Sequence, residues 1–92
     1  MRAIRPNQTG GPEVLAIQDI PTPSPGSGEA LVQVEASGVN YIDVYHRSGL
    51  YPLALPLPMG LEGAGTVEQV GDGVRDLQAG QRVAALGTSV RQ

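Results

Sequence analysis

The side chains that can do chemistry in this sequence gather in one run, residues 38–65. Asn40 carries an amide there, and Tyr45 and Tyr51 carry phenol hydroxyls. A group that donates a hydrogen bond can stabilise negative charge as it grows on a reacting oxygen. Because the chain has no Cys, thiolate chemistry is excluded. The run therefore places an amide and two phenols on one predicted helix and the loop after it.

The same residues also fit purely structural roles. Asn40 lies where a helix would begin, and with Asp43 three positions on it can form a capping box. A cap needs no function, although the two roles of Asn40 are compatible. Tyr45 and Tyr51 can instead be core aromatics, since most tyrosines are partly buried.

Metal and nucleotide sites have little support in the residues themselves. A catalytic zinc needs three protein ligands, usually His, Cys or carboxylate. His46 is the only His of the chain, and we interpret it as an ordinary helix-face residue. The glycines near residue 63 are not the dinucleotide fingerprint G-x-G-x-x-G, because the sixth position counted from Gly63 is Glu68 and a strand follows rather than a helix. Close backbone approach and turns explain these glycines.

Composition excludes several other classes of function. Ninety-two residues allow one small domain. With a net charge of −3 and no Lys, the chain lacks the clustered basic residues that nucleic acid binding needs. Its apolar stretches are broken by Pro or Gly before they could span a membrane, and its first ten residues contain no apolar signal region. We therefore expect a cytoplasmic protein with neither a nucleic acid nor a membrane partner.

The pattern of apolar residues and turns predicts a mainly β protein. Thirteen Gly and eight Pro favour short strands and many turns. The clearest strand alternates Ala and Val on one face with mostly polar residues on the other. The expected elements are strands over residues 1–5, 14–20, 29–39, 66–70 and 82–86, with one short helix over residues 40–48. Such a chain folds as a compact barrel or sandwich.

Four segments resemble a known family, in the right order and at natural spacing. They are GGPEVL at residues 10–15, GVNYIDVYHRSGLYP at 38–52, PMGLEGAGTVEQVG at 58–71 and AGQRV at 79–83. Together they resemble the zinc-independent quinone oxidoreductase (zeta-crystallin-like) branch of the medium-chain dehydrogenase/reductase superfamily. Only residues 87–92 depart from the pattern. The resemblance implies that residues 1–92 are the N-terminal part of a GroES-like catalytic domain, a partial β-barrel, and that the Rossmann cofactor domain is absent.

The resemblance also bears on metal binding. Zinc-dependent relatives place a Cys where this chain has Asn40 and a His where it has Leu61. Asn is a poor zinc ligand and Leu is none, so the resemblance implies a site without metal. Glu62, beside Leu61, then has no metal ligand to orient, and we interpret it as structural.

The implied activity is reduction of a quinone or another activated carbonyl or alkene by NADPH. The resemblance places Asn40 beside the cofactor, as the cofactor-binding residue, and Tyr45 and Tyr51 around the substrate, as the catalytic residues. Tyr41 matches a position that is usually just aromatic, so we expect it in the core. The full-length relative is expected to be a homodimer, and this chain alone is expected to be an inactive fragment.

Two other functions remain as alternatives. One is a stand-alone GroES-like binding module or co-chaperonin, which presents a mobile apolar loop to its partner. The obvious loop here, residues 22–28, contains no apolar anchor, which disfavours this function. The other alternative lies within the same superfamily, as the enoyl reductase piece of a synthase.

Overall fold

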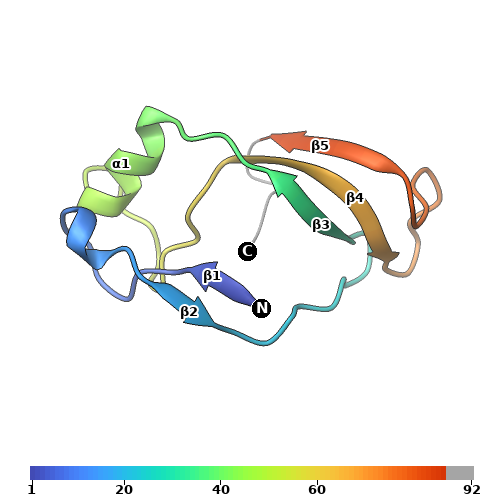
Figure 1. Ribbon diagram of the computed structural model, residues 1–92, viewed down its shortest axis with the longest axis horizontal. Coiled ribbons are helices and arrows are strands. Elements are labelled where there is room, and N and C mark those ends of the chain that lie inside the picture. Colours follow the sequence, from blue (N-terminus) through green and yellow to red (C-terminus); the bar gives the residue numbers. More distant parts are fainter. Residues whose placement is uncertain (87–92) are drawn as a thin grey trace.

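The structure is a computed structural model that describes residues 1–86 of the chain (Figure 1). These residues form five strands, one turn of 3₁₀-helix and one α-helix. In chain order the elements are β1 (Arg2–Ile4), η1 (Pro12–Val14), β2 (Ile17–Asp19), β3 (Ala30–Ala36), α1 (Tyr41–Ser48), β4 (Glu62–Val70) and β5 (Arg82–Leu86). The prediction of a mainly β fold with one short helix is confirmed.

The strands form two separate antiparallel sheets. β4 is the middle strand of a three-stranded sheet in the order β3-β4-β5, whereas β1 pairs with β2. The long β4 ribbon runs between β3 and β5 in Figure 1, and α1 lies at the other end of the molecule. Within residues 1–86 the two sheets do not close on each other. The fold is therefore a partial barrel, as expected.

The middle strand contains glycine because its neighbour comes very close. Gly63 and Gly65 both lie in β4. A Cβ atom on Gly65 would lie 3.0 Å from the Cα atom of Val34, and closer still to the carbonyl group of Gln33. A Cβ atom on Gly63 would meet no neighbour nearer than 3.8 Å. Close backbone approach therefore accounts for Gly65, as the sequence predicted, but not for Gly63.

Signals in its own sequence begin and end α1. The backbone N–H of Asn40 donates to Oδ2 of Asp43 at 2.9 Å, as in a capping box. Gly49 follows the last helical residue with a φ of 88°, a left-handed conformation that favours glycine. The last turn is held by Gly10, whose N–H donates to the carbonyl of Arg47 at 2.9 Å. The predicted helix is confirmed, with Asn40 as its cap.

Few apolar side chains are buried among the described residues. Leu57 and Val67 have almost no exposed surface, and Pro6 is equally buried. The N–H of Leu57 donates to the carbonyl of Pro6 at 2.8 Å, which joins the proline-rich loop after α1 to the turn after β1. Val34 and Leu86, on the outer strands of the sheet, remain largely exposed. Hydrogen bonds therefore contribute more than the burial of apolar side chains to holding these segments together.

Four of the five predicted strands have other bounds in the structure, and the first, predicted over residues 1–5, is the slightly shorter β1. The strand expected over residues 66–70 begins earlier, at Glu62, because the segment from Glu62 pairs with β5. The strand expected over residues 14–20 shortens to β2, because Pro12 begins the turn of η1. The strand expected over residues 29–39 is the shorter β3, which ends before the chain turns toward α1.

The C-terminal part of the described chain agrees with its prediction. The last strand, predicted over residues 82–86, has the same bounds in the structure. The departure from the family pattern at residues 87–92 lies outside the described residues. Within residues 1–86 no helix combines the length and the apolar character needed to cross a membrane.

Replacing Gly65 by Ala should weaken the pairing of β3 with β4. The added methyl group would press on backbone atoms of β3, an overpacking cost of about 1–3 kcal/mol. Gly63→Ala is the matched control, since the same change in the same strand has room for its methyl group. Thermal melts followed by circular dichroism should give the lower midpoint for Gly65→Ala. Equal midpoints for the two variants would contradict the close approach of the strands.

Candidate functional site

Asn40 and Glu62 form the polar centre of the candidate site. The two side chains are half-buried, and Nδ2 of Asn40 donates to Oε2 of Glu62 at 3.1 Å. This contact joins the beginning of α1 to the first residue of β4. Asn40 therefore serves as helix cap and as a link to the sheet at the same time.

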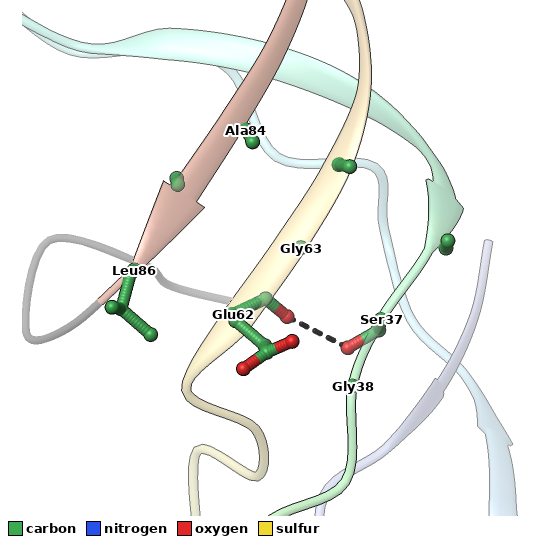
Figure 2. A pocket seen from close by; sticks show the side chains of 9 residues that line it. Ser37, Gly38, Glu62, Gly63, Ala84 and Leu86 are labelled. Atoms are coloured by element: carbon green, nitrogen blue, oxygen red, sulfur yellow. Dashed lines mark hydrogen bonds between the residues drawn. The ribbon is translucent and has the colours of Figure 1, made fainter.

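The backbone around Glu62 is held by the end of β3. Oγ of Ser37 donates to the carbonyl oxygen of Glu62 at 2.8 Å, the dashed line in Figure 2. The Glu62 side chain passes so close to Gly38 that a Cβ atom on Gly38 would overlap the carboxylate. Gly38 therefore leaves the space that this side chain occupies.

An open hollow of about 580 Å³ lies where β3 and β5 end and β4 begins (Figure 2). Most of its wall is made of Ala and Gly, with Leu86 at one side, and Ser37 and Glu62 are its polar lining residues. The three predicted site residues do not line this hollow. Asn40 reaches its edge only through the hydrogen bond to Glu62.

Tyr45 and Tyr51 are brought together by the end of α1. Their ring centroids lie 5.2 Å apart with the rings inclined at 67°, an edge-to-face pair. The N–H of Tyr51 also donates to the carbonyl oxygen of Tyr45 at 3.2 Å. Tyr45 is half-buried and Tyr51 is 50% exposed. The two phenols therefore form one aromatic unit with access to solvent.

The predicted site residues thus fall into two groups. Asn40 lies at the N-terminal end of α1, and the tyrosine pair lies at and just beyond its C-terminal end. No hydrogen bond joins the groups within residues 1–86. The expectation that Tyr41 belongs to the core is wrong, because its side chain is 82% exposed.

Sequence reasoning missed the contact that Glu62 makes. The sequence predicts a structural role for Glu62, with no metal ligand to orient beside Leu61, and names no partner for it. A signal was present, since a carboxylate in the apolar, glycine-rich run Gly60–Gly65 needs a hydrogen-bond donor once it is half-buried. Nothing in the spacing of 22 residues showed that the donor is Asn40.

The described part of the chain contains no metal-binding cluster. Three or more His, Cys, Asp or Glu side chains do not come together anywhere within it. His46 lies half-buried in the last turn of α1. Gly63 and Gly65 lie inside β4 rather than ahead of a helix, so this segment does not have the geometry of a phosphate-binding turn. What the site offers is hydrogen-bond donors and aromatic surface.

Comparison with known families gives a match over most of the chain. Residues 26–91 match the alcohol dehydrogenase GroES-like domain. This range contains β3, β4, β5 and α1, together with Asn40, Glu62 and both tyrosines of the pair. The sheet and the candidate site therefore both lie in the matched region.

Two quinone oxidoreductases are similar to this chain over most of its length. Quinone oxidoreductase of Rattus norvegicus is 47% identical over 91 residues, which are 96% of this chain and 28% of that protein. Quinone oxidoreductase of Pseudomonas aeruginosa is 51% identical over 76 residues, 82% of this chain and 23% of that protein. The chain therefore spans about a quarter of the length of these relatives.

Solved structures show the same fold. Escherichia coli quinone oxidoreductase complexed with NADPH is 43% identical, with a TM-score of 0.88, over 95% of this chain and 28% of that one. A mycobacterial protein complexed with NADPH is 49% identical, with a TM-score of 0.90, over 95% of this chain and 28% of that one. From the matched domain and these likenesses, the chain belongs to the alcohol dehydrogenase GroES-like domain family, within the medium-chain dehydrogenase/reductase superfamily.

Proposed function

We propose that residues 1–92 are the N-terminal part of the catalytic domain of a quinone oxidoreductase. The whole protein would transfer hydride from NADPH to a quinone or another activated carbonyl or alkene, and this part alone would be inactive. The names of the relatives and the NADPH complexes of two similar structures support the proposal. The observation that carries it is the set of donors on α1 and the loop after it, namely Asn40, Tyr45 and Tyr51.

The tyrosine pair fits a planar, electron-poor acceptor. An edge-to-face pair with one half-exposed ring offers an apolar wall on which a second ring can stack. Within residues 1–86 neither phenol hydroxyl of Tyr45 or Tyr51 has a hydrogen-bond partner. A free hydroxyl can donate to the acceptor oxygen as negative charge grows there. We assign this donation to Tyr51, the more exposed of the two, and the stacking wall to Tyr45.

Asn40 fits an oxygen of the cofactor or of the acceptor. Its amide nitrogen has two protons, of which the described residues engage one, through Glu62. The other proton can be donated to a ribose hydroxyl or a carbonyl oxygen. NADPH itself would supply the hydride, and the protein would supply position and electrostatics.

We further propose that the reaction proceeds without zinc. Asn40 and Leu61 occupy the positions where zinc-dependent relatives carry a Cys and a His, and neither provides a good zinc ligand. A cytoplasmic homodimer with a small-molecule substrate remains our expectation for the whole protein. The alternative acceptor, an enoyl thioester, shares the same donor chemistry. A co-chaperonin is not proposed, because the named relatives include oxidoreductases over this same segment.

A chimaera tests the proposal directly. Residues 1–92 would replace the matching segment of Escherichia coli quinone oxidoreductase, whose structure is 43% identical over this part. We expect the chimaera to bind NADPH and reduce quinones, and the isolated 92-residue chain to show no binding in a fluorescence titration, because it has no glycine-rich phosphate turn. A chimaera that folds and binds NADPH but reduces no quinone or enone would contradict the proposed function.

Removal of one phenol hydroxyl in the chimaera should separate the two tyrosines. Tyr51→Phe should lower kcat for quinones about 10- to 100-fold, the effect of losing one donor to a developing charge. Tyr45→Phe should do less, because the ring that stacks is kept. Tyr41→Phe is the matched control, since Tyr41 lies on the same helix but outside the tyrosine pair. Equal rates for all three variants would remove both tyrosines from the mechanism.

A further inference from the structure

We infer that Glu62 is a positioning residue, whose carboxylate fixes the direction in which the Asn40 amide presents its free N–H. The inference rests on the proposed function, because Asn40 matters to the reaction only if it contacts the cofactor or the acceptor.

The chemistry of the pair determines the orientation of the amide. An ionised carboxylate can only accept hydrogen bonds, whereas an amide has a donor end and an acceptor end. Oε2 of Glu62 must therefore face Nδ2 of Asn40 rather than Oδ1, as the 3.1 Å contact shows. A rotation of the amide by 180° would set two acceptors against each other. The second proton on Nδ2 is thereby directed away from Glu62 and is available to a bound molecule.

Both partners are held by different rigid elements. Glu62 is the first residue of the middle strand, and Ser37 donates to its carbonyl oxygen at 2.8 Å. Its side chain lies in the space left by Gly38. Asn40 is held at the start of α1 by the hydrogen bond from its N–H to Asp43. The Asn40 amide is therefore fixed between the sheet and the helix.

The helix itself does not need this contact. The carboxylate of Asp43 already accepts from the N–H of Asn40 at 2.9 Å, and the N–H of Asp43 donates to the carbonyl oxygen of Asn40 at 3.0 Å. These bonds stay in place when Glu62 is removed. Loss of Glu62 should therefore remove the acceptor that faces Nδ2 of Asn40 while α1 remains formed by its capping box, which separates positioning from folding.

The first test is a double-mutant cycle in the chimaera. Glu62→Ala should lower kcat/KM about 10- to 100-fold, the equivalent of one hydrogen bond to a charged group. In an Asn40→Ala background the same change should have no further effect, because Glu62 acts only through Asn40. Glu68→Ala, on an exposed residue of the same strand, is the matched control and should leave kcat/KM unchanged. Additive losses from the two substitutions would overturn the inference.

The second test exchanges the two groups. Glu62→Gln alone keeps an acceptor oxygen of the same reach and should recover most of the activity lost in Glu62→Ala. Asn40→Asp combined with Glu62→Gln restores a hydrogen bond but leaves only acceptors at position 40. The exchanged protein should therefore melt near the parental temperature and stay at least about tenfold less active. Parental activity in the exchanged protein would show that the pair is structural and would overturn the inference.

Failure of the proposed function has a different outcome. If the chimaera with the native pair reduces no quinone or enone, the function fails, and neutron diffraction structures of the chimaera and its Glu62→Ala variant, which distinguish the amide nitrogen from the oxygen, decide the inference. A turned Asn40 amide in the variant would support positioning by Glu62. The same amide direction in both structures would overturn it.

Discussion

The arrangement of the site depends on one carboxylate at the start of the middle strand. The N-terminal end of α1 is joined to the sheet by the hydrogen bond from Asn40 to Glu62. At its other end, the loop residue Gly10 bonds to Arg47. These hydrogen bonds hold the two ends of the helix. Hydrogen bonds at the ends therefore position Asn40 and Tyr45.

The sparse core explains why polar contacts carry so much of the geometry. Leu57 and Val67 are the apolar side chains with almost no exposed surface in the described chain, and each lies in a different part of it. The N–H of Leu57 binds the carbonyl oxygen of Pro6, while Val67 lies in the middle strand. The close approach of β3 to β4 at Gly65 also fixes the position of these two strands relative to each other. Each of these is a local constraint, and together they leave α1 and the tyrosine pair at one end of the molecule (Figure 1).

Local chemistry was predictable from the sequence, and contacts between distant segments were not. The capping box, the glycine that ends α1 and the last strand all follow from neighbouring residues, and the structure confirms them. The beginning of β4 depends on pairing with β5, which lies further along the chain. Tyr41 was predicted in the core because it matches a position that is usually aromatic in the family, but its side chain is 82% exposed. The role of Glu62 depends on a partner 22 residues away.

The contacts of Glu62 also limit how related genes can be recombined. Its main chain and side chain bind Ser37 and Asn40, which lie 25 and 22 positions earlier, and Gly38 leaves room for it. A crossover between Asn40 and Glu62 would take Glu62 from one parent gene, and its partners Ser37 and Asn40 from another. Crossovers before Ser37, or beyond Glu62, would pass these residues on together. Shuffled libraries of this domain family should therefore be enriched in folded members when segment boundaries avoid residues 37–62.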